Sequence, residues 1–174
     1  VPVTCSVCGR RFTAEARTIV DVGQEPELKA RLINGQINMA VCPHCGNLGM
    51  LNAPLCYHDP EKELFFCLIP QELGLSGEEQ EKLIGNLVNR VMNSLPPEKR
   101  KAYLLQPKTF FSMASMVEEI LHAEGITDEM LAAHQARLTL IQELLACRDE
   151  EELRKLAEER KEELDYEFFN PLAF

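Results

Sequence analysis

The sequence predicts an α+β protein in which a small antiparallel sheet is followed by a bundle of amphipathic helices. Up to about residue 70, short β-branched and aromatic runs alternate with turn residues, and four cysteines form two C-x-x-C pairs. Beyond residue 77 the apolar residues recur with helical spacing. We therefore expect a zinc-ribbon-like β region over residues 1–70 and a helical region over residues 71–174.

The composition is that of a folded, soluble chain. Of the 174 residues, 45% are hydrophobic and 26% are charged, close to the globular average. No apolar run approaches the roughly 20 residues that cross a bilayer, and the first residues lack the pattern of a signal peptide. A cytoplasmic protein without membrane contact is expected. The net charge of -10 opposes attraction to phosphate backbones, so nucleic acid is an unlikely partner.

Three runs in the β region are rich in the residue types that strands prefer, namely residues 18–22, 37–41 and 64–69. A short helix is expected between the first two, because Pro26 suits its first turn and Gly35 its C-terminal cap. The segment Tyr57-His58-Asp59-Pro60 has turn composition. We expect it to join a strand over about residues 48–56 to the strand at 64–69, which completes the antiparallel sheet.

Helix start and stop signals divide the second half into about four helices. Ser76 and Glu79 form a capping box before a long apolar stripe that Pro96-Pro97 ends. A second helix should begin near Ser112 or Ser115 and end at Gly125. The predicted N-caps of the last two helices are Thr127 and Asp149.

Two features of these helices leave the oligomeric state open. Leu131, Leu138 and Leu145 are spaced by seven, but three heptad positions fall short of a sustained coiled coil, and packing within the chain is favoured. The C-terminal segment is strongly aromatic and should dock on its own chain or on a partner. Its aromatic and apolar residues are Tyr166, Phe168, Phe169, Leu172 and Phe174.

The strongest chemical signal is the pair of segments Cys5-Ser6-Val7-Cys8-Gly9 and Cys42-Pro43-His44-Cys45-Gly46. A C-x-x-C turn brings two sulfurs together, and the following glycine can adopt the positive φ that points backbone amides at them. Four thiolates in a tetrahedron select zinc, or iron in rubredoxin-like sites. We expect one structural Zn²⁺ bound by Cys5, Cys8, Cys42 and Cys45. The interval between the pairs exceeds the usual zinc-ribbon spacing, which an inserted helix explains.

Two other functions use the same residues. Cys-Pro-His-Cys is also the motif of strongly oxidising thiol-disulfide oxidoreductases, which would use Cys42 and Cys45, but the sequence after it is poor in helix formers. A nucleic-acid-associated zinc ribbon would use Arg10-Arg11 beside the first pair. His44 is expected to be a surface or supporting residue, not a ligand.

The remaining cysteines and histidines have structural explanations. Cys56 and Cys67 lie among apolar residues on expected strands and should be small buried hydrophobes, and Cys147 an ordinary free thiol. His122 and His134 are single helical histidines. No nucleophile elbow, phosphate-binding loop or H-E-x-x-H motif is present. We expect neither catalysis nor a small-molecule substrate, and predict a scaffold that binds a protein partner or forms a homodimer.

Four segments resemble the CpXC-domain proteins, a bacterial and archaeal family named for paired cysteine motifs. They are the two cysteine pairs, Pro-Leu-Cys-Tyr-His-Asp at 54–59, and the expected helical stretch Leu-Gln-Pro-Lys-Thr-Phe at 105–110. The resemblance covers most of the chain and implies that Cys5, Cys8, Cys42 and Cys45 are the four defining cysteines. Ser6 replaces the proline of the family name, which weakens the rigid turn and leaves the ligands in place. The resemblance supports the fold and the metal and adds little about function.

Overall fold

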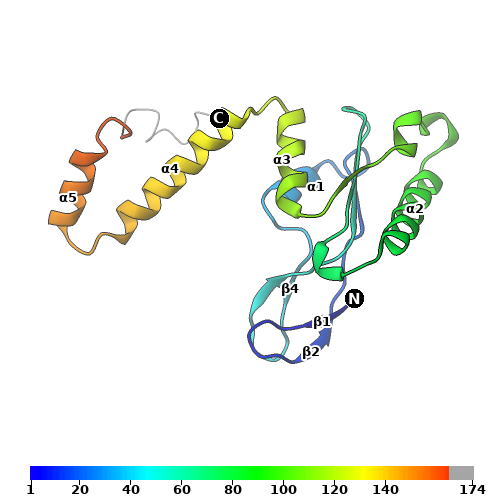
Figure 1. Cartoon of the computed structure of the whole chain (residues 1–174), viewed down its shortest axis with the longest axis horizontal. Helices are drawn as coiled ribbons and strands as arrows, with labels where there is room; N and C mark the ends of the chain where they lie inside the picture. The colour runs from blue at the N-terminus through cyan, green and yellow to red at the C-terminus, as the bar shows by residue number, and fades with distance from the viewer. Residues whose placement is uncertain (165–174) are drawn as a thin grey trace. The chain divides into compact units, whose positions relative to one another are not determined.

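The structure, a computed structural model, describes residues 1–164, and the chain divides into two compact units, Val1–Ala123 and Glu124–Phe174 (Figure 1). The sequence predicted a boundary near residue 70, where the hydrophobic period changes. The compact units divide later because the next helices pack on the sheet of the first unit. The aromatic residues expected to dock, between Tyr166 and Phe174, lie outside the described residues.

The first unit is built on a four-stranded sheet with strand order β3-β6-β7-β8. β6 and β7 pair antiparallel, whereas β3 pairs with β6 and β7 with β8 in parallel. The central sheet is therefore mixed, and the prediction of a purely antiparallel sheet was wrong for it. The long connection from β3 to β6 brings the chain back in the same direction. The strands are β3 Ile19–Asp21, β6 Leu55–Asp59, β7 Leu64–Leu68 and β8 Lys108–Phe110.

Three details of these strands differ from expectation. Residues 48–56 do not form one strand, because β5 ends at Met50 and β6 begins at Leu55 in another sheet. The expected turn at residues 57–60 is mostly strand, since β6 continues to Asp59. The stretch 105–110, expected to be helical, contains β8.

Helices cover both faces of the central sheet. Helices α1 (Glu27–Ile33) and α3 (Met113–Ala123) pack on one face, and α2 (Gly77–Ser94) packs on the other. Side chains alternate between the faces along each strand: Phe66 joins the first cluster and Phe65 the second. The sequence predicted that the helices pack into a bundle. In this unit they instead form one layer on each side of the sheet. The fully buried centre includes Val20, Leu28, Leu32, Leu55, Tyr57, Ile69, Val91, Leu104, Met116 and Ile120.

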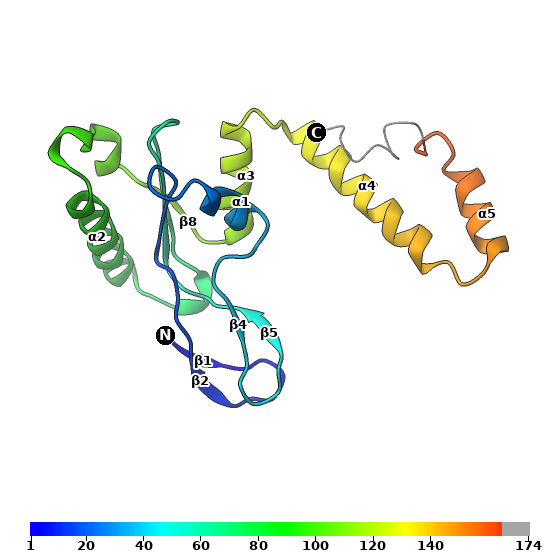
Figure 2. The same cartoon turned by 180° about the vertical axis from the view of Figure 1, so that it is seen from behind.

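Two short antiparallel hairpins lie side by side at one end of the first unit (Figure 2). β1 (Pro2–Thr4) pairs with β2 (Arg11–Thr13), and β4 (Met39–Val41) pairs with β5 (Leu48–Met50). We call residues 1–14 and 39–50 the cysteine lobe. The predicted antiparallel pairing is confirmed here in part: β4 and β5 lie within predicted strands, whereas β1 and β2 were not predicted, and the two hairpins form separate sheets.

The helix starts were predicted well. Ser76 and Glu79 form the capping box of α2, and Thr127 and Asp149 accept amide hydrogen bonds at the starts of α4 (Asp128–Ala146) and α5 (Glu150–Glu159). Short 3-10 turns complete the first unit at η1 (Gln71–Leu73), η2 (Pro97–Lys99) and η3 (Ala102–Leu105). Within residues 1–164, no helix is both long enough and apolar enough to cross a bilayer.

Candidate metal centre

The two cysteine pairs occupy equivalent turns in the two hairpins. In each turn the first cysteine directly follows a strand, and its carbonyl accepts a hydrogen bond from the glycine four residues later. Its amide donates to the carbonyl of the residue five positions later, Arg10 in one turn and Asn47 in the other. The amides of Gly9 and Gly46 donate to the carbonyls of Cys5 and Cys42 at 3.0 and 2.9 Å. Both glycines have positive φ, 69° and 73°, which favours glycine over residues with a side chain.

The turns bring all four sulfurs to one point. The Sγ atoms of Cys5 and Cys45 are 3.6 Å apart, those of Cys8 and Cys42 are 3.8 Å apart, and the four ligand atoms lie within 4.8 Å of one another. Each short contact joins one hairpin to the other. The four cysteines predicted as one site therefore lie together, and the cluster could hold a metal ion.

The electrostatics of the cluster require a cation if all four sulfurs are to be ionised. Backbone amides of Cys8 and Val7 lower the pKa of the Cys5 thiol to about 6. The amide of Asn47 also lowers the pKa of Cys45, but burial and the neighbouring Cys5, Cys8 and Cys42 thiols raise it to about 12. One thiolate forms readily, whereas further ones meet like charge. A bound metal ion supplies the missing positive charge.

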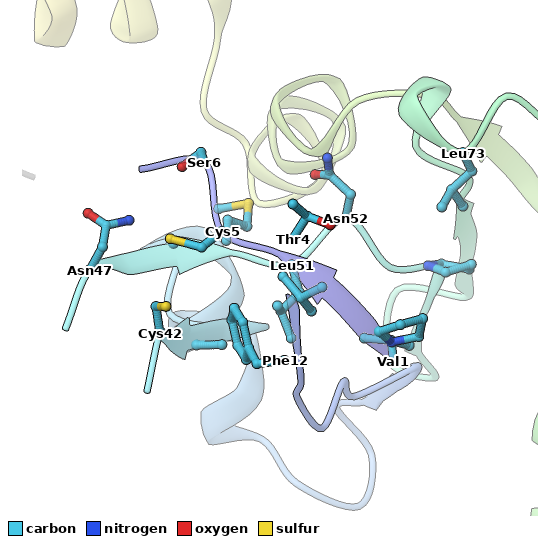
Figure 3. A pocket seen from close by; sticks show the side chains of 16 residues that line it. Val1, Thr4, Cys5, Ser6, Phe12, Cys42, Asn47, Leu51, Asn52 and Leu73 are labelled. Atoms are coloured by element: carbon cyan, nitrogen blue, oxygen red, sulfur yellow. The ribbon is translucent and has the colours of Figure 1, made fainter. Parts of the chain in front are cut away.

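The cysteines also take the place of an apolar core in this lobe. Across residues 1–14 and 39–50, all of which the structure describes, the only buried residues are Cys5 and Cys42. Beside them lies a cavity of about 480 Å³ between β1 and β5. Figure 3 shows the two cysteines toward one end of the cavity, with Phe12 and Leu51 along it and Leu73 toward the other end.

The other predicted residues lie away from the sulfur cluster. His44 is exposed in its turn and is absent from the cluster, as expected. Cys56 and Cys67 are fully buried neighbours on β6 and β7 with their Sγ atoms 3.0 Å apart, as expected for core residues. Contact with Cys67 and burial raise the pKa of Cys56, which therefore stays a neutral thiol. Cys147 follows the end of α4.

Sequence reasoning missed a second group of polar residues, buried in the central sheet. Asp21, His58 and Asp59 are each at most 6% exposed, and Tyr103 of η3 contacts His58. Asp59 pairs with Lys29 at 2.7 Å. The available signal was the pair His58-Asp59 at the end of an apolar strand. Because Pro60 follows, the pair resembled a turn in the sequence.

These observations define a class of protein: a mixed α/β unit that carries two equivalent cysteine turns, one on each of two hairpins, with their sulfurs in a single cluster. The family model described as CpXC protein matches residues 3–135. The chain therefore belongs to the CpXC family. No curated protein and no solved structure matches it significantly.

Proposed function

We propose that the chain is a structural zinc protein whose cysteine lobe serves as a protein-interaction module without catalysis. The sulfur geometry supports a tetrahedral metal site, and zinc is the usual ion of a four-cysteine site. A tetrahedron with Zn–S bonds of about 2.3 Å has edges of about 3.8 Å, and two of the inter-hairpin sulfur pairs are 3.6 and 3.8 Å apart. Two hairpins that bind one ion between their turns form a zinc-ribbon-like lobe. Four protein ligands leave no position for substrate, so the ion is structural.

The interaction role is supported by apolar side chains on the surface of the β4–β5 hairpin. Met39 lies opposite Met50 and Val41 opposite Leu48, so alternation places the four side chains on one face. All four are exposed. An apolar face on a hairpin fixed by a metal ion is a rigid surface, which costs little entropy to bind a protein partner or a second copy of the chain. A group of exposed apolar side chains is typical of an interaction site.

Native mass spectrometry of the purified full chain tests the metal assignment. We expect one zinc ion per chain, and elemental analysis distinguishes zinc from iron. Cys8→Ser should lose the ion, whereas Cys147→Ser, which alters a thiol outside the cluster, should keep it. A full chain that binds no metal after refolding with zinc would contradict the assignment.

The interaction role is tested separately by charge substitution on the exposed face. Leu48→Lys should abolish self-association or capture of a defined partner in sedimentation experiments and leave the zinc content unchanged. The matched control is Leu105→Lys, because Leu105 is also an exposed leucine but lies outside the lobe. A wild-type chain that stays monomeric over a wide concentration range and recovers no partner contradicts the interaction role and leaves the zinc assignment intact.

A further inference from the structure

The buried polar residues of the central sheet gather where two parallel strands end. Asp21 is the last residue of β3 and lies in register with His58, the penultimate residue of β6. In sheets with parallel strands, ligands bind at the carboxyl ends of the strands. The position of this pair is therefore one at which a binding site is expected.

Asp21, His58 and Tyr103 form a continuous line of contacts. The Oδ1 atom of Asp21 is 3.2 Å from Nδ1 of His58, and Nε2 of His58 is 2.8 Å from the Tyr103 hydroxyl. Burial raises the pKa of Asp21, but contacts with His58 and Gln24 outweigh it and hold the pKa below its usual value. The carboxylate therefore favours a proton on Nδ1, and Nε2 is left to accept the hydrogen bond of Tyr103. The Tyr103 oxygen keeps lone pairs for a further donor.

The same three residues line a cavity of about 240 Å³. This volume is smaller than the roughly 300 to 1,000 Å³ typical of drug-sized ligands, so it suits a small molecule. Leu95 and Pro60 provide apolar wall. Asp21, Glu98, Lys99 and Lys101 are the charged lining residues, and Lys101 already pairs with Glu63 at 2.6 Å. Negative charge therefore predominates around the cavity, which disfavours an anionic ligand.

A purely structural role explains the neighbouring Asp59 better than it explains His58. Asp59 pairs with Lys29 and accepts the backbone amides of Glu61 and Lys62, which fixes the turn after β6. His58 is 1% exposed, and its two ring nitrogens face two residues that line the cavity, Asp21 at 3.2 Å and Tyr103 at 2.8 Å.

We propose that this cavity binds a small uncharged compound that carries hydroxyl groups, one of which donates a hydrogen bond to the Tyr103 oxygen. The carbon skeleton rests on Leu95 and Pro60. His58 and Asp21 position the Tyr103 hydroxyl, and only Tyr103 contacts the ligand hydroxyl. This site is independent of the sulfur cluster and of the proposed zinc function.

The test is a titration of the zinc-loaded full chain, labelled with ¹³C-histidine, with glycerol and with longer linear polyols. We expect a saturable shift of the His58 ring resonance and none at His44 or His134, which lie outside the cavity. Tyr103→Phe removes one hydrogen bond and should weaken binding about tenfold. Tyr57→Phe is the matched control, because that hydroxyl bonds Asp59 and does not line the cavity.

Three results would overturn the proposal. The first is the absence of a saturable His58 shift with every polyol. The second is undiminished binding by Tyr103→Phe. The third is binding of the matching carboxylic acids in preference to the polyols, which would show that charge and not the hydroxyl is recognised. The positions of the other histidine resonances report in each case whether the variant is folded.

Discussion

The cysteine lobe and the central sheet of the first unit are stabilised by different means. In the lobe the strands are three residues long and the only buried residues are Cys5 and Cys42. In the central sheet β6 is buried along its whole length, because helices cover both faces. We therefore expect the lobe to depend on an ion bound by its sulfurs, whereas the sheet has an apolar core on each face.

Because the two regions are stabilised differently, different residue types indicate a candidate binding site in each. A lobe without an apolar core leaves apolar side chains such as Val41 and Leu48 exposed, and we propose this surface as the interaction site. In a sheet with an apolar core, polar residues are costly to bury, and the buried Asp21 and His58 belong to the second site that we propose. Experiments that separate the two regions test both interpretations.

The largest expected effect is that of metal removal. Chelation, or Cys42→Ser, should unfold the cysteine lobe and leave the central sheet folded. Structural zinc contributes about 10 to 16 kcal/mol in small zinc peptides, comparable to or larger than the roughly 5 to 15 kcal/mol that stabilises a typical domain. Hydrogen exchange should show lost protection at β1, β2, β4 and β5 and retained protection at β6 and β7.

Cys147→Ser is the control for this comparison, because its sulfur lies outside the cluster. Equal loss of protection in β6 and β7 would show that the two regions unfold as one, and unchanged protection in the lobe after complete metal removal would show that the sulfurs are dispensable.

The next largest effect is expected from a substitution in the apolar core of the central sheet. Ile120→Ala removes a fully buried side chain of α3 and should lower the free energy of unfolding of the sheet by about 2 to 5 kcal/mol. The zinc content should not change. Leu105→Ala, at a residue that is 68% exposed, should cost less than about 0.5 kcal/mol. Loss of zinc from Ile120→Ala would mean that the lobe relies on the sheet.

The sequence was sufficient to predict features that a few neighbouring residues determine. The two C-x-x-C-G turns were identified because each turn is specified within five residues, and so were Ser76, Thr127 and Asp149, whose side chains cap the next helix. The meeting of the four sulfurs followed from the residue types alone, since an isolated C-x-x-C pair offers only half of a tetrahedral site.

The sequence was insufficient where long-range pairing decides structure. The parallel pairing of β3 with β6 joins residues 19–21 to 56–58, and no local signal specifies it. The site at Asp21, His58 and Tyr103 exists only after this pairing. His58 and Asp59 precede a proline and therefore resembled a turn, because tertiary burial, not local preference, makes them strand residues.

Acid should destabilise the central sheet through Asp59. Burial raises its pKa, but hydrogen bonds from Lys29 and from the amides of Lys62 and Glu61 hold it below the usual 3.8. The resulting stabilisation is complete above the unfolded pKa and is lost as the pH falls from there through the folded pKa. Asp59→Asn should lower the free energy of unfolding by about 1.5 to 3 kcal/mol at neutral pH. On acidification to about pH 3, the variant should lose less stability than the wild type.

Urea midpoints of both proteins at the two pH values measure this effect. Acid also protonates thiolates in the lobe, but it does so equally in both proteins, so the difference between them isolates Asp59. A parallel acid dependence in wild type and variant would show that the ion pair with Lys29 contributes nothing to the sheet.

The smallest expected effect concerns one helix cap. The Ser76 hydroxyl accepts from the Glu79 amide, and the Glu79 carboxylate accepts from the Ser76 amide at 2.8 Å. Ser76→Ala should cost about 1 kcal/mol, and since α2 packs on the sheet, the loss should appear in the unfolding of β6 and β7. Thr127→Ala removes the N-cap of α4 in the second unit, where the Thr127 hydroxyl accepts from the Met130 amide, and should leave the sheet unchanged. An equal effect of both variants on the sheet would show that the two units unfold together.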